Sequence, residues 1–248
     1  MFLNGCDSAG HRVFEEVVEQ VYPVDPNANI SIHNQDGAIL VYGSQVNEVR
    51  VRTLKRAYSQ ERLNQIAIDV STQPGAVSVS VKVPPRRKWA FRDHSGTVDC
   101  TIVVPATASI AALDLHAGEV LLDSMHGREV HARLGDGRIF ARNCFSAQDL
   151  TMNRGTLTLT YDWWEQEKFS AQVNVGQGNA WVFLPSDAGF HLLARAAHGK
   201  IANDFNDVPL ANSSGREMEI DETVNGGASA TIQIRVDKGN IKIAEANP

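Results

Sequence analysis

Apolar and polar residues alternate strictly in many short segments along the chain. The clearest runs lie at residues 30–32, 49–51, 77–83, 157–161, 232–236 and 241–243. A period of two sends one set of side chains to a buried face and the other set to solvent, which is typical of half-buried β-strands. The pattern therefore predicts an all-β protein.

Helical spacing is convincing at one place, residues 59–66. Ser59 can cap a first turn there, and Leu63 and Ile66 can share one apolar face before a strand at 66–70 begins. We therefore expect one short helix in the first third of the chain.

Glycines precede short apolar runs at intervals of about 20 residues. The series follows an early Gly37 and consists of Gly118, Gly137, Gly155, Gly178, Gly199 and Gly239. A period of this length is typical of stacked repeats, in which each unit buries its apolar edge against its neighbours. Glycine suits tight corners because it adopts positive φ without a Cβ clash. Gly127, between two of these glycines, suggests two strands of five or six residues in each coil.

The repeat predicts a parallel β-solenoid with stacked coils of about 20 residues. The open end of such a stack needs a cap, and we expect an N-terminal cap that contains the short helix. Residues 13–248 are predicted to form this single β-solenoid domain, and residues 1–12 a tether or the remnant of a lipoprotein signal. A chain of 248 residues with 43% hydrophobic content can bury one large core.

Charge and hydropathy narrow the choice of partners. The formal net charge is −6, from 23 basic and 29 acidic side chains, so no global positive field attracts nucleic acid or anionic lipid. No apolar run reaches the roughly 18 residues that a membrane-spanning helix requires. The block LNGC at residues 3–6 resembles a lipobox, so either Cys6 is the lipidated first residue of a mature lipoprotein or the match is accidental. Membrane contact is expected only through this possible lipid anchor.

An ordered set of sequence blocks resembles the bacterial putative-adhesin family, a β-strand-repeat domain of unknown function related to the toast-rack domains. The blocks are VYPVDPNANI at 21–30, NQDGAI at 34–39, VYGS at 41–44, NEVRV at 47–51, VDCTIVVP at 98–105, VFLP at 182–185, FHLLA at 190–194, GKI at 199–201 and GNIKI at 239–243. The resemblance covers residues 13–244. It implies a parallel β-solenoid in an exported or membrane-tethered bacterial protein, and it carries no catalytic residues. This chain departs from the family's pattern in its histidine-rich middle.

The sequence gives only weak signals for catalytic or metal-binding residues. His116, His126 and His131 lie close in sequence and invite a metal hypothesis, but the repeat places them at different points around a coil. The acids Asp114 and Asp136, or Asp123 and Asp162, could form the carboxylate pairs of a glycosidase, yet no column of acids recurs at the repeat spacing. Nucleophile, P-loop and dinucleotide motifs are absent. We expect a protein that is not an enzyme and has no metal or cofactor.

Two aromatic segments are the candidate contact sites. The first combines cations and aromatics in a stretch that prolines bar from a central strand, and it contains Arg86, Arg87, Lys88, Trp89 and Phe91. The second is the pair Trp163 and Trp164. In a strand the two indoles would point to opposite faces, so one could stack on a sugar or dock a partner, whereas the alternative is that they wedge a widened corner.

Cys100 and Cys144 complete the candidate chemistry. They read either as buried free thiols or as a disulfide pair.

The sequence as a whole predicts a non-catalytic, extracytoplasmic β-solenoid of the cell envelope, an adhesin or interaction scaffold that binds a glycan or an envelope protein. The alternatives are a carbohydrate-active enzyme, a polysaccharide lyase or hydrolase with carboxylates converging on one solenoid face, and an envelope stress-signalling accessory protein. The sequence does not separate the accessory protein from the scaffold.

Overall fold

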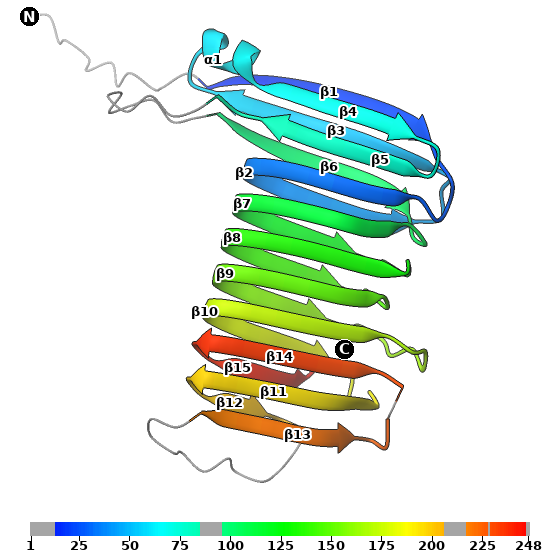
Figure 1. The fold of residues 1–248 in the computed structure, drawn as a ribbon, viewed down its shortest axis with the longest axis vertical. Coiled ribbons are helices and arrows are strands. Elements are labelled where there is room, and N and C mark those ends of the chain that lie inside the picture. Colours follow the sequence, from blue (N-terminus) through cyan, green and yellow to red (C-terminus); the bar gives the residue numbers. More distant parts are fainter. Residues whose placement is uncertain (1–12, 85–95, 206–216, 228, 247–248) are drawn as a thin grey trace, which may run out of the picture.

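The computed structural model describes residues 13–84, 96–205, 217–227 and 229–246, which form strands and one short helix (Figure 1). In chain order the elements are β1 (Phe14–Pro23), β2 (Asn29–Ser44), β3 (Glu48–Ala57), α1 (Gln60–Gln65), β4 (Ala67–Gln73), β5 (Ala76–Lys82), β6 (Thr97–Pro105), β7 (Ser109–Asp123), β8 (Glu129–Arg142), β9 (Ala147–Thr160), β10 (Ser170–Leu184), β11 (Phe190–His198), β12 (Ile201–Asn203), β13 (Met218–Val224), β14 (Thr231–Lys238) and β15 (Ile241–Glu245). The prediction of an all-β protein is confirmed.

All of these strands belong to one mixed sheet, which does not close on itself. Its main path runs β1-β3-β6-β2-β7-β8-β9-β10-β14-β11-β13. The pairs β1–β3, β3–β6, β4–β5 and β11–β13 are antiparallel, and the pairs between β2, β7, β8, β9, β10 and β14 are parallel. The prediction of a parallel β-solenoid is therefore wrong, because antiparallel pairs build both ends of the sheet.

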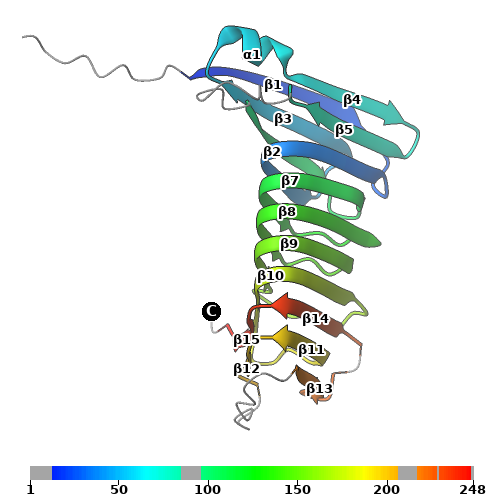
Figure 2. The same ribbon diagram turned by 60° about the vertical axis from the view of Figure 1, so that its left-hand side comes forward.

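The chain also does not wind in sequence order. Strands β14 and β15 pair with β10, so they lie between β10 and the earlier strands β11 and β12 (Figures 1 and 2). At the other end β6 pairs with the second half of β2, while β5 pairs with its first half. Stacked coils that follow one another along the sequence cannot give this order.

The glycine repeat corresponds to long bent strands, which we call rungs. In each of β2, β7, β8, β9 and β10 one continuous strand of 14 to 16 residues bends near its middle, so the two strands per coil expected from Gly127 are the two arms of one strand. Gly127 itself lies in the connection between β7 and β8. The repeat glycines stand in register, Gly37 beside Gly118, Gly118 beside Gly137 and so on to Gly178. Their φ angles, from +124° to +139°, suit glycine.

The bend also explains where the core lies. In β8 the buried residues are Val130, Ala132 and Leu134 before Gly137, and Ile139 and Ala141 after it, so the alternation slips by one residue at the glycine. Both sets belong to one buried apolar cluster. The arms of each rung therefore share a core, and each arm keeps an outer face toward solvent.

The short helix is confirmed, at Gln60–Gln65. The Ser59 side chain accepts a hydrogen bond from the Arg62 backbone N–H at 3.2 Å, and Leu63 is buried. The helix lies at the β1 end of the sheet, the N-terminal end (Figure 1).

Candidate functional site

In each rung the first arm precedes the repeat glycine and the second arm follows it. One row of side chains on the second arms is mostly apolar and is at least partly exposed to solvent. Parallel register places the third residue after each repeat glycine side by side. The row, which we call the outer row, consists of Leu40, Leu121, Phe140, Thr158 and Trp181. Neighbouring strands are about 4.8 Å apart, so these five residues span about 19 Å. The Trp181 side chain is 41% exposed, and the other four are half-buried.

A surface groove of about 910 Å³, which we call the outer groove, lies over the Phe140–Trp181 part of this row and over the repeat glycines from Gly37 to Gly155. Phe140, Thr158 and Trp181 contribute to its lining, together with Glu119 and Arg138. Large apolar side chains with a few polar groups are the usual composition of ligand sites.

The charged groups of the outer groove neutralise one another. Arg138 Nη2 donates to Glu119 Oε2 at 2.7 Å, and this hydrogen bond raises the pKa of Arg138. At one end of the groove, Asp99 accepts from Arg56 and from the Ala38 backbone N–H. The groove therefore offers paired charges that can form hydrogen bonds with a polar ligand, without a net charge to select an ion.

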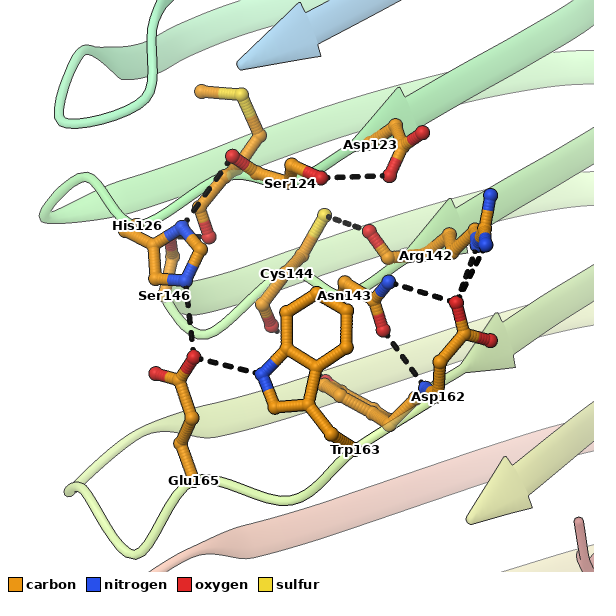
Figure 3. A network of polar contacts seen from close by, with 12 residues as sticks. Asp123, Ser124, His126, Arg142, Asn143, Cys144, Ser146, Asp162, Trp163 and Glu165 are labelled. Atoms are coloured by element: carbon orange, nitrogen blue, oxygen red, sulfur yellow. Dashed lines mark hydrogen bonds and ion pairs between the residues drawn. The ribbon is translucent and has the colours of Figure 1, made fainter. Parts of the chain in front are cut away.

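The loop between β9 and β10 holds the second exposed tryptophan (Figure 3). Trp163 is 45% exposed, and its indole N–H donates to Glu165 Oε1 at 3.0 Å. His126 Nε2 lies 3.3 Å from the same oxygen, and the Trp163 ring lies 6.0 Å from that of Phe145. Protein groups therefore already engage the indole N–H and fix the ring.

Asp162 anchors the start of this loop to the preceding rung (Figure 3). It accepts hydrogen bonds from Asn143 Nδ2 at 3.0 Å and Arg142 Nε at 2.8 Å, and these two contacts lower its pKa. The Asp162 backbone N–H donates back to Asn143 Oδ1 at 2.8 Å. Asp162 thus makes structural contacts here.

Trp164 occupies a different environment from its neighbour. Its ring centroid lies 5.5 Å from Tyr161, 5.2 Å from Phe169 and 5.9 Å from Phe190, in an aromatic cluster against the core. The two tryptophans lie in a loop, so the assumption that they share a strand is wrong. Trp164 packs in this cluster, and a contact role for either residue stays a prediction.

The other predicted contact residues lie outside the described residues. These are Cys6, the possible lipidation site, and the cation-aromatic segment with Arg86, Arg87, Lys88, Trp89 and Phe91.

The histidines and acids that the sequence analysis considered as metal ligands or catalytic pairs do not form such sites. They contact other groups instead. His131 lies between Glu129 and Asp149, at 3.3 and 3.8 Å, while His126 belongs to the loop cluster. Among the described residues no three His, Cys, Asp or Glu side chains gather as a metal site. The four candidate acids make contacts with other groups: Asp114 with His33, Asp136 with Arg154, Asp123 with Ser124 and Asp162 with Arg142.

Both described cysteines are buried and free, which confirms the free-thiol interpretation over the disulfide. Burial raises the pKa of each thiol, Cys100 and Cys144, to about 12.

Trp181 is the residue that sequence reasoning missed as a site. It follows Gly178 by three positions, as Phe140 follows Gly137 and Leu121 follows Gly118. The large side chains at this outward position of the repeat could therefore have been recognised from the sequence as a candidate surface.

Comparisons with known proteins concern the fold. No protein-family model matches the chain, and no curated protein matches it. A "putative cell adhesion protein" from Clostridium sporogenes is 14% identical with a TM-score of 0.52, over 93% of this chain and 100% of that one. A "putative adhesin" from Bacteroides fragilis is 9% identical, with a TM-score of 0.30 and coverage of 92% and 97%. A "putative lipid binding protein" from Parabacteroides distasonis is 10% identical, with a TM-score of 0.33 and coverage of 94% and 97%.

The Clostridium protein shares the fold of this chain. The name of the Clostridium protein agrees with the resemblance to the putative-adhesin family that the sequence blocks carry. In the part of the chain that the structure describes, the one helix, Gln60–Gln65, is far too short to span a bilayer.

Proposed function

We propose that this protein is a non-catalytic, adhesin-like binding protein of the cell envelope, and that its outer groove binds a glycan. The observation that carries the proposal is Trp181, whose indole stands 41% exposed in a groove of about 910 Å³. An indole combines a large apolar face with one hydrogen-bond donor, which suits a ligand that is apolar on one side and polar at its edges. A sugar ring has this character.

The surroundings of Trp181 support a saccharide rather than an apolar ligand. Thr158 lies beside it in register, and Thr156 adds a second hydroxyl to the groove. The Arg138–Glu119 pair supplies both charge-assisted donors and acceptors for ligand hydroxyls. Phe140 extends the apolar surface two rungs away from Trp181, enough for a second ring of a chain.

The carboxyl groups support a non-catalytic role. A general acid for glycoside cleavage needs a raised pKa. Among the described residues, the two carboxyl groups with a clear shift, Glu129 and Asp162, have their pKa lowered by hydrogen bonds from neighbouring side chains. In the outer groove, Glu119 is held by Arg138.

An envelope location is supported by the name of the Clostridium protein that shares this fold and by the lipobox-like block that ends at Cys6. Cell fractionation of the native host, followed by mass spectrometry of the peptide that contains Cys6, tests this part of the proposal. Recovery of the protein in the cytoplasmic fraction with an unmodified Cys6 would contradict it.

A glycan array probed with the wild-type protein tests the binding function. We expect retention of one class of neutral glycan, and loss of that signal in Trp181→Ala. Trp163→Ala is the matched control, because it removes a tryptophan of similar exposure outside the outer groove. Equal signals for wild type and Trp181→Ala, or silence of the wild type across the array, would refute the proposal.

A further inference from the structure

A second groove, of about 540 Å³, lies on the outer face of the first arms, and we call it the basic groove. Outward residues of five neighbouring strands line it: Ser80 and Lys82 from β5, His33 from β2, Asp114 and His116 from β7, Arg133 from β8, and Thr151 and Asn153 from β9. Register places His33 beside both Ser80 and Asp114, and Asp114 beside Arg133.

Two cations of this groove lack an acidic partner. Lys82 and Arg133 make no ion pair with any described residue, although the chain has an excess of acids and a net charge of −6. Asp114, the one carboxylate in the lining, is engaged by His33 Nδ1 at 3.0 Å. By contrast, Arg138 on the same strand as Arg133 is paired with Glu119, and Arg154 on β9 is paired with Asp136. The basic groove is therefore a local positive site on an acidic protein.

The groove is also kept open and lined with neutral hydrogen-bonding groups. A Cβ at Gly135 would lie 2.3 Å from the His116 carbonyl oxygen and 3.5 Å from His116 Nδ1, so glycine there leaves the space beside the imidazole clear. Besides the charged residues, the lining carries amides and hydroxyls that can bind ligand hydroxyl groups: Gln35, Ser80, Thr151 and Asn153.

We propose that the basic groove binds an acidic polysaccharide whose carboxylates pair with Lys82 and Arg133. The two cations lie on β5 and β8, which β2 and β7 separate, and Lys82 lies two residues beyond the register position of Arg133, so their backbones are about 16 Å apart. A linear polyanion spans this distance and meets the amides and hydroxyls between. This site is separate from the outer groove and does not depend on the glycan proposed there.

The test measures binding of polygalacturonate by calorimetry, with fully methyl-esterified polygalacturonate as the uncharged ligand of the same backbone. We expect binding of the acid form only, weakening as sodium chloride is added because salt screens the charges. Lys82→Gln combined with Arg133→Gln should weaken binding about tenfold or more, since two charge-assisted contacts are lost.

The control is Lys200→Gln combined with Lys238→Gln, which changes the net charge equally at exposed positions outside the groove. We expect it, and Trp181→Ala, to bind polygalacturonate like the wild type, and all variants to keep the wild-type melting temperature. Two results would overturn the proposal: no binding of polygalacturonate by the wild type, whether or not it binds phosphatidylglycerol vesicles, or equal weakening by both double variants. Loss of neutral-glycan binding in Trp181→Ala with retained polygalacturonate binding would show that the two sites act separately.

Discussion

Gly137→Ala tests whether the rungs stack through their glycines. Gly137 has a φ of +139°, and a Cβ built there would lie 1.8 Å from the Gly118 carbonyl oxygen of the neighbouring rung. Real Cβ atoms essentially never approach another atom more closely than 3.0 Å, so the two backbones would have to separate by roughly 1.2 Å. That movement weakens the parallel ladder on both sides of the bend.

The expected loss has two parts. Forcing alanine into this backbone conformation costs about 1 to 3 kcal/mol. Disrupting one or two backbone hydrogen bonds of the ladder adds about 1 to 3 kcal/mol. The unfolding free energy should therefore fall by about 2 to 6 kcal/mol, which for a domain of this size lowers the melting temperature by roughly 5 to 20 °C.

Gly75→Ala is the matched control. Gly75 lies between β4 and β5 with a φ of +74°, and a Cβ there would meet nothing within 4 Å. This substitution carries conformational strain alone, so we expect a loss of about 1 kcal/mol. Urea unfolding followed by circular dichroism compares the two variants. Equal losses of unfolding free energy in the two variants would refute the view that glycine is needed in this column because the neighbouring backbones approach closely, and not merely because φ is positive.

Three further predictions concern single residues. Ser59→Ala should lower the unfolding free energy by about 0.5 to 1 kcal/mol in the same urea assay, because the helix loses its N-cap; an unchanged midpoint would contradict this. Cys100 and Cys144, with pKa values of about 12 and buried sulfurs, should resist iodoacetamide at pH 8 in the folded protein and react in urea; peptide mass spectrometry that finds rapid labelling of the folded protein would refute it. The lowered pKa of Asp162 gives a stability contribution that is present above the unfolded-state pKa and is lost as the pH falls through the folded-state value. The destabilisation caused by Asp162→Asn should therefore shrink below about pH 4, and a difference that does not change with pH would exclude the effect.

Local features of the fold could be predicted from the sequence, and the order of strands could not. Alternation and the Ser59 cap each depend on a few neighbouring residues, and the glycine interval is a spacing along one chain, so all three can be found in the sequence and each marks a real element. Pairing partners depend on tertiary contacts that periodicity does not encode. The segment with Gly239 looks like one more repeat, yet its strands lie between β10 and the pair β11 and β12.

The same difference between local features and tertiary contacts applies to the candidate site. Trp163 and Trp164 were predicted as contact residues because they are adjacent in the sequence. In the structure both lie in one loop, where Trp163 is exposed and Trp164 packs in the aromatic cluster. Trp181 looked ordinary in its own segment. Its position three residues after a repeat glycine was a signal in the sequence, but the register of the assembled sheet is what places it in one exposed-side row with Phe140 and Leu121.

A titration followed by the indole Nε1–H signals of the tryptophans in two-dimensional NMR tests the outer groove most directly. With the neutral glycan selected on the array as ligand, the account predicts that the Trp181 signal shifts saturably while the Trp163 and Trp164 signals stay in place. A saturable shift of Trp163 with an unchanged Trp181 signal would contradict the central claim that the exposed row on the second arms is the binding surface.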